Sequence, residues 1–155
     1  MVVIAEIVTE LVTVENFIKS LYPSSVYKQE IPLRPDPDTF SVRAFSSSHI
    51  NETGYHYRID RTYQIMYIAE NHPQLLSRID SLGRALYGVL VIPIEGSDNR
   101  YLRVMGYNTT APFETENDLY GQIAVLDCAV REARSQPEYQ KIMHIFARYM
   151  TRVQI

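Results

Sequence analysis

The chain has 155 residues, 46% hydrophobic and 21% charged, so it is long and apolar enough to fold around a core of its own. Its formal net charge of −3 at pH 7 disfavours direct nucleic-acid binding, which normally needs a clustered excess of Lys and Arg. The single cysteine, Cys128, cannot form an internal disulfide, and no apolar run approaches the roughly 20 residues of a membrane-spanning helix. We expect one domain over residues 1–155, made in a reducing cytoplasm and without a membrane partner.

The first predicted element is an amphipathic helix over residues 3–21, because apolar residues recur there at three- and four-residue spacing. Its β-branched residues lower the intrinsic helix propensity, so tertiary packing must hold it. A strand is expected over residues 26–33. Pro35 and Pro37 lack amide donors and restrict the residues before them, which places a surface loop over residues 34–38.

Two strands joined as a long antiparallel hairpin are predicted next. Apolar and polar residues alternate over residues 40–46, and after a serine-rich connection over residues 46–54 the alternation resumes over residues 55–69. The second strand, which we name the arm, would extend about 50 Å at about 3.4 Å per residue. Few strands in small domains are that long, so we expect part of the arm to project beyond the core.

The second half of the chain begins with a predicted helix. Pro73 suits the first position of this helix, whose apolar stripe continues to residue 89. Two strands over residues 90–94 and 100–108 are separated by turn-forming residues and predict a second hairpin. A loop over residues 109–117 then leads to a strand over residues 120–130 that we expect to be buried on both faces at its centre.

A last helix is predicted after Pro137, and residues 133–155 would form a C-terminal helical extension. Its apolar stripe consists of Ile142, Ile145, Phe146, Tyr149 and Val153. The predicted fold class is therefore α+β, with an antiparallel or mixed β-sheet, helices packed on one face and the order helix-βββ-helix-βββ-helix. Hairpin-length connections, rather than helical crossovers, favour this class.

The sequence predicts no catalytic residue, no metal ligand and no cofactor. Six glycines lack the spacing of a phosphate-binding loop, and four histidines lack the spacing that places two ligands on one metal. His49, His56 and Glu52 could meet across the hairpin, although a solvated loop is the better interpretation. Asp36 and Asp38 lack the further ligands of a calcium loop, so we interpret them as a charged surface turn.

Two further polar groups are interpreted as structural. Cys128 lies in the middle of an apolar strand face, where a free cysteine is usually a small buried hydrophobe. Asp80 and Arg84 have the i, i+4 spacing of an exposed salt bridge on a solvated helix face.

The arm is the strongest candidate for an interaction surface. Charged residues interrupt its alternating tyrosines, and protein interfaces enrich tyrosine and arginine because each buries a large area while keeping a polar tip. An ordinary half-exposed strand would show the same pattern, so both interpretations stay open. The candidate subunit-interface residues are Tyr57, Arg58, Asp60, Arg61 and Tyr63.

The arm contains the run YRIDRTYQIMY, from Tyr57 to Tyr67. In this run the sequence resembles the tail terminator (tail completion) proteins of long-tailed bacteriophages and related prophages, many of which carry an Arg-x-Tyr-x-[Ile/Phe]-x-Tyr-like strand. The surrounding order is also similar, with FSVR before the arm, a helix of the Leu75-Leu76-x-x-Ile79 type and a late strand like GQIAV. The resemblance covers about residues 1–132, and the helix after Pro137 is an extension that not every member has.

The resemblance implies a structural virion protein without catalytic residues. Such a protein forms a homohexameric ring that caps the tail tube, ends tube polymerisation and presents a docking face to the head and neck. Its partners would be copies of itself, the tail tube protein and a head stopper or neck protein, while genomic DNA passes through the ring without sequence-specific binding. It would be made in the host cytoplasm and lie in the virion, at the head-proximal end of the tail. The candidate partner-facing or lumen-facing loop residues are Arg34, Asp36, Asp38, His49 and Glu52.

Two alternatives remain. A head completion or stopper protein of the neck would also form rings from small subunits, and the sequence separates it poorly from a tail terminator. A soluble enzyme or small-ligand module would instead use the groove beside the sheet, and would be a monomer or dimer with a measurable ligand.

Overall fold

The computed structural model describes residues 7–97 and 99–136. Within them lie two helices and seven strands: α1 (Ile7–Leu21), β1 (Ser25–Lys28), β2 (Thr39–Asn51), β3 (His56–Ala69), α2 (His72–Val89), β4 (Val91–Pro93), β5 (Tyr101–Thr109), β6 (Phe113–Glu114) and β7 (Tyr120–Ala133). The predicted start of the first helix, at residues 3–6, and the helix predicted after Pro137 lie outside the described residues.

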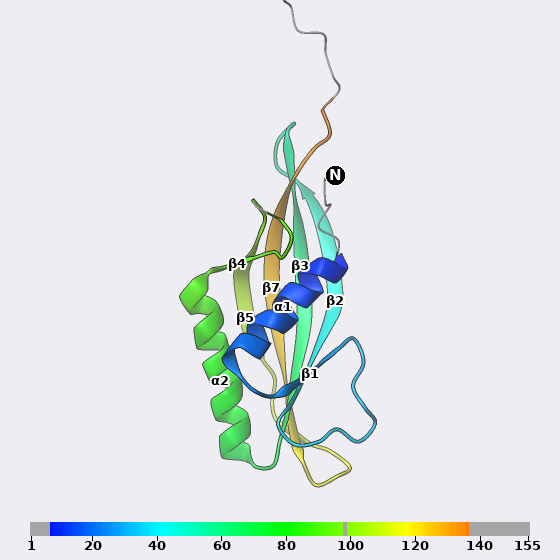
Figure 1. The fold of residues 1–155 in the computed structure, drawn as a ribbon, viewed down its shortest axis with the longest axis vertical. Helices are drawn as coiled ribbons and strands as arrows, with labels where there is room; N and C mark the ends of the chain where they lie inside the picture. The colour runs from blue at the N-terminus through cyan, green and yellow to red at the C-terminus, as the bar shows by residue number, and fades with distance from the viewer. Residues whose placement is uncertain (1–6, 98, 137–155) are drawn as a thin grey trace, which may run out of the picture.

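The strands form one mixed sheet in the order β1-β2-β3-β7-β5-β4, and β6 pairs with β7 beside that path. β1 runs parallel to β2, and every other pair is antiparallel. Figure 1 shows α1 crossing the front of the sheet and α2 running along the side formed by β4 and β5. The predicted α+β class, with a mixed sheet and helices on one face, is confirmed.

The core lies between the helices and one face of the sheet, because successive strand residues point to opposite faces. Along β3 the odd-numbered residues from Ile59 to Tyr67 are buried, whereas the even-numbered residues from Arg58 to Met66 are half-buried on the other face. The helices add their own apolar residues to the core: Leu11, Val14, Ile18, Leu75, Ile79, Leu82 and Leu86. Burial of each such side chain contributes roughly 1.5–3 kcal/mol, which holds the β-branched α1 in place.

α2 begins where the sequence predicts and packs closely on β5. The Asn71 side chain accepts a hydrogen bond from a first-turn backbone N–H (2.9 Å), and Pro73 follows in that turn. At Gly83 a Cβ atom would lie 2.7 Å from a ring carbon of Tyr107, whose hydroxyl donates to the Ile79 carbonyl (2.9 Å). This close approach accounts for a glycine in the helix despite its entropic cost.

The three largest differences from the predicted strands concern β1, β2 and β6. β1 ends at Lys28, so the loop before β2 is longer than expected. β2 continues to Asn51, through the serines that the sequence assigns to a connection, because pairing with β3 supplies the backbone hydrogen bonds of those residues. The predicted loop over residues 109–117 contains the short strand β6.

β3 occupies the centre of the sheet. It pairs with β2 on one side and with β7 on the other, over its whole length from His56 to Ala69. Figure 1 shows that the turn joining β2 and β3 reaches beyond both helices, so the expected projection is confirmed for the tip of the hairpin. Because both backbone edges of β3 are already paired, the outward-facing edge of the hairpin belongs to β2.

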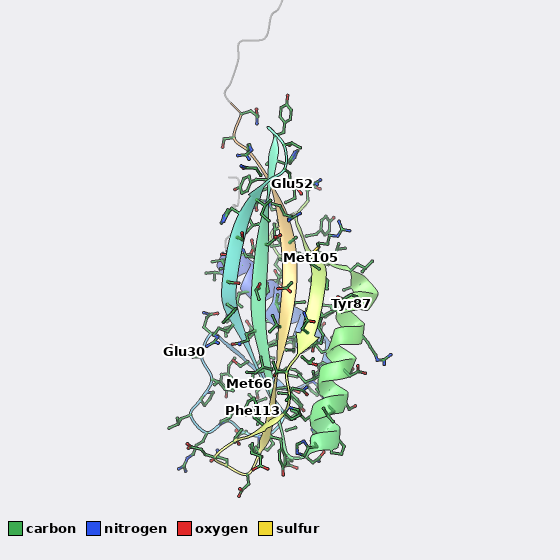
Figure 2. All side chains as sticks on the ribbon, turned by 180° about the vertical axis from the view of Figure 1, so that it is seen from behind. Glu30, Glu52, Met66, Tyr87, Met105 and Phe113 are labelled. Carbon is green, nitrogen blue, oxygen red and sulfur yellow. The ribbon has the colours of Figure 1, made fainter. Side chains whose placement is uncertain are left out.

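The second face of the sheet, which we name the open face, carries no helix of the described residues (Figure 2). Ile123 and Val125 of β7 lie on this face and are half-buried. The predicted burial of β7 on both faces is therefore wrong, because neighbouring strand side chains are the only cover that these two residues have within the described chain.

Candidate interaction surfaces

β2 has two halves with different surroundings. Residues 39–42 pair with β1 on their outer side. Gln29 continues this contact: its backbone N–H donates to the Val42 carbonyl (2.8 Å), and its side-chain oxygen accepts from the Ala44 N–H (2.6 Å). Along residues 45–51 no strand of the described chain pairs with the outer side. We name residues 45–51 the outer edge.

The outer edge lacks the usual protection of a natural edge strand against pairing with other chains. Its sequence, FSSSHIN, has no Lys, Arg, Asp, Glu or Pro, and every residue in it is exposed, with Phe45 at 61%. A bulge between Ala44 and Ser46 is its one irregularity. The opposite edge of the sheet, β4, has only three residues and ends in Pro93. An extended segment of another chain can therefore add to the sheet beside β2 far more readily than beside β4.

The tip of the hairpin next to the outer edge carries aromatic residues. The His49 ring stacks on Tyr57 with 6.2 Å between centroids, and the Arg134 guanidinium lies 5.5 Å from the Tyr57 ring centroid. Arg134 also donates to the Asn51 side chain (2.5 Å), which joins the end of β7 to the end of β2. Tyr55 is 67% exposed at the turn. His49 thus lies on a strand, not in the predicted loop.

Charged residues of the open face lie beside this tip. Arg58 donates to Asp60 (2.8 Å), and this hydrogen bond raises the pKa of the Arg58 guanidinium above its ordinary value. Glu52 accepts from Arg131 (2.7 Å) and lies 4.0 Å from Arg58. Three of the predicted interface residues are half-buried and keep part of their surface in contact with solvent: Tyr57, Arg58 and Asp60.

Arg61 and Tyr63 are buried by the chain itself, so we correct their assignment as subunit contacts. Arg61 is 9% exposed and donates to a Glu10 carboxylate oxygen (2.7 Å). Tyr63 has no exposed surface and donates to the same oxygen (3.4 Å). Burial, together with the charge of Glu10, raises the pKa of the Tyr63 hydroxyl. Both residues are odd-numbered like the apolar residues of β3, and the helices cover that face.

The predicted loop residues before β2 divide into two kinds. Arg34 and Asp36 are exposed and remain candidates for partner contact. Asp38 is half-buried and accepts hydrogen bonds from Ser24 (2.8 Å) and Tyr67 (2.5 Å), so it holds the loop to the core instead. Burial, with the carboxylate of Asp38 beside it, raises the pKa of Tyr67 to about 12.

Other sequence interpretations concern possible chemistry. Burial raises the pKa of the Cys128 thiol to about 12, so it is protonated at neutral pH, and its assignment as a buried hydrophobe is confirmed. Asp80 and Arg84 form the predicted exposed salt bridge (2.8 Å).

Within residues 7–97 and 99–136, no three His, Cys, Asp or Glu side chains are placed to hold a metal ion. None of the described helices has the length and apolarity to cross a membrane.

Sequence reasoning missed a set of buried charges beneath the helices. Glu10 has no exposed surface, and Arg100 pairs with the buried Glu132 (2.7 Å). Burial raises the pKa of the Glu132 carboxyl, although Arg100 opposes this. A signal was present, because Glu10 lies on the apolar stripe of the first helix and Glu132 continues the buried alternation of β7.

Comparisons with known proteins leave the family open. No protein-family model matches the chain, and no curated protein matches it. One similar solved structure, whose title describes no function, has 13% sequence identity and a TM-score of 0.46, and the match covers 84% of this chain and 94% of the other. A second, titled as the virion of a native gene transfer agent particle, has 14% identity and a TM-score of 0.44, with 83% and 100% covered. Likeness at this level does not identify a function for this chain.

Proposed function

We propose that the protein is a structural subunit of a bacteriophage virion that forms a homohexameric ring at the head-proximal end of the tail. The ring caps the tail tube, ends its polymerisation and offers a docking face to the neck. The motif in the arm supports this identity. The observation that carries the assembly is the unprotected outer edge of β2, which lies beside an exposed hairpin tip rich in tyrosine.

The outer edge favours contact between subunits because its backbone groups have no strand partner on one side. Unpaired edge N–H and C=O groups template the addition of another strand, and natural monomers usually block them with charge, proline or shortness. The outer edge has none of these features over seven residues. Exposed Phe45, Ile50 and Tyr55 supply apolar area beside it.

The two edges of the sheet also favour a closed ring over an open-ended sheet. β4 is too short to pair along the whole outer edge of a neighbour. In the proposed ring the outer edge contacts a different surface on the next subunit, since pairing with the outer edge of a second copy would stop at a dimer. A contact of that kind is heterologous, and it closes into a ring when the rotation between subunits permits.

The direct test compares two exposed serines, each replaced by lysine. Ser47→Lys places a charge on the outer edge, whereas Ser77→Lys places the same charge on the solvated face of α2. Mass photometry of wild type and of Ser77→Lys should show particles near six copies, and Ser47→Lys should be monomeric with an unchanged circular dichroism spectrum. Wild-type protein that stays monomeric alone and with tube protein, or that stops at a dimer, would refute the ring.

The function within the tail is tested with tube protein. Wild-type rings should bind one end of assembled tubes and stop their growth in electron micrographs, and Ser47→Lys should leave tube length uncontrolled. Rings that bind a neck protein but never a tube end would instead assign the protein to the neck as a head completion or stopper protein.

A further inference from the structure

A pocket of about 310 Å³ on the open face is lined by residues that include four arginines, three of which carry their guanidinium groups on this face. Its floor includes Val91, Tyr101, Met105 and Ala129. The arginines come from three strands and a turn: Arg58, Arg100, Arg103 and Arg131. Protein interfaces are enriched in arginine, tyrosine and methionine, and this pocket combines all three with a partly apolar surface.

The positive charge of this pocket is only partly neutralised by the described residues. Asp60 forms an ion pair with Arg58, and Glu52 forms one with Arg131 and lies 4.0 Å from Arg58. Arg100 pairs with Glu132 through one terminal nitrogen, and its other terminal nitrogen, Nη1, is buried without an acceptor. Arg103 is exposed and forms no ion pair with any described carboxylate. The Arg100 guanidinium lies with Glu132 on the covered face, so an incoming carboxylate on the open face would pair with Arg103.

The complementary charge lies at the other end of the same molecule. The turn between β6 and β7 exposes three acidic residues, Glu114, Glu116 and Asp118, and none of them pairs with a described Lys or Arg. In Figure 2 the labelled Phe113 beside this turn lies far below Met105 and Glu52, which line the pocket. The turn and the pocket of one chain are therefore too far apart to meet.

We propose that the arginine pocket binds the acidic turn, residues 114–118, of a second copy of this chain. The contact joins two different surfaces, so it is directional and adds a second heterologous contact between subunits. The carboxylates of the turn approach Arg103, and Arg58 and Arg131 at the rim steer the encounter. The proposal rests on the proposed ring for its place in an assembly, but the contact itself does not require the outer edge of β2.

Disulfide trapping tests this contact without removing any charge. Met105→Cys places a thiol in the pocket and Asn117→Cys places one in the acidic turn, while native Cys128 is buried. The two variants are mixed and oxidised, and the mixed disulfide is measured on a non-reducing gel. We expect at least a tenfold excess over the control pair of Met105→Cys with Ser77→Cys, whose thiol lies on α2.

The charge dependence of the trapped product is the second measurement. Adding Glu116→Lys to the Asn117→Cys variant should abolish the mixed disulfide. Raising the salt concentration from about 0.05 to about 1 M should strongly lower the yield of the mixed disulfide, because the Debye screening length shortens to about 3 Å. No excess over the control pair, or a yield unchanged by Glu116→Lys, would overturn the proposal.

The same experiment in a Ser47→Lys background separates this contact from the ring. Loss of rings with retention of the mixed disulfide would support both proposals as independent contacts. Wild-type rings without the mixed disulfide would overturn only the pocket contact. Mixed disulfide between the two cysteine variants, with wild-type protein that never forms rings, would sustain the pocket contact and defeat the ring.

Discussion

The two halves of β2 show how one strand can serve both folding and assembly. The inner half, residues 39–44, lies between β1 and β3, and its Phe40 is fully buried. The outer half, residues 45–51, has a partner on one side only and is exposed throughout. Side-chain burial therefore decides the role of the inner half, whereas free backbone groups decide that of the outer half.

The largest expected difference between the halves is at their phenylalanines. Phe40 lies between the rings of Tyr22 (5.6 Å between centroids) and Tyr67 (4.5 Å), so Phe40→Ala should lower the free energy of unfolding by about 3–5 kcal/mol. Phe45→Ala removes the same atoms from an exposed site and should change that free energy by about 0.5 kcal/mol or less. Urea denaturation of both variants measures the contrast, and equal losses would show that the halves do not differ in this way.

A second difference lies at the arginines of β3, which pairs with β2. Arg61→Ala leaves the buried Glu10 carboxylate without its partner and should lower the free energy of unfolding by about 3–5 kcal/mol. Arg58→Ala, on the open face, is the matched control and should leave the unfolding midpoint almost unchanged. Thermal unfolding followed by circular dichroism distinguishes the two.

Replacing both buried charges sharpens that result. Glu10→Leu with Arg61→Met removes the carboxylate together with its partner, so the double variant should be more stable than Arg61→Ala. A double variant that is as unstable as Arg61→Ala would mean that the hydrogen bond from Tyr63, and not the ion pair, holds this site.

A smaller, pH-dependent effect is expected where α1 meets β1, beside the inner half of β2. Burial alone would raise the pKa of the Glu15 carboxyl, but hydrogen bonds from Lys19 and Lys28 outweigh burial and lower it below its ordinary value of 4.5. The ionised form therefore stabilises the fold above about pH 4.5, and this stabilisation is lost as the pH falls through the lowered folded-state pKa.

Glu15→Gln tests this linkage. It should lower the free energy of unfolding at pH 7 by about 1 kcal/mol or less, since both lysines are half exposed. The difference from wild type should shrink as the pH is lowered towards 3 in denaturant titrations. A difference that grows on acidification would give the wrong sign and exclude the ion pairs as its cause.

The sequence predicts the helices and strands of this fold better than it predicts what each of them pairs with or packs against. Period-2 alternation located β3 and β7, and Pro73 located the start of α2, because these signals are local. The end of β2 was missed, since serines become a strand only through pairing with β3. The interface assignment of Tyr57, Arg58 and Asp60 stays a prediction, whereas Arg61 shares the odd-numbered, apolar face of β3, and its charge alone did not show that α1 buries it.

Amide hydrogen exchange tests the central claim, that the outer edge of β2 joins one subunit to the next. Assembled wild-type protein is compared with the Ser47→Lys variant by mass spectrometry. In the assembly, peptides covering residues 45–51 should exchange at least tenfold more slowly, while those covering α2 (His72–Val89) should be unchanged. Unchanged exchange at residues 45–51, or slowing confined to β4, would contradict the claim.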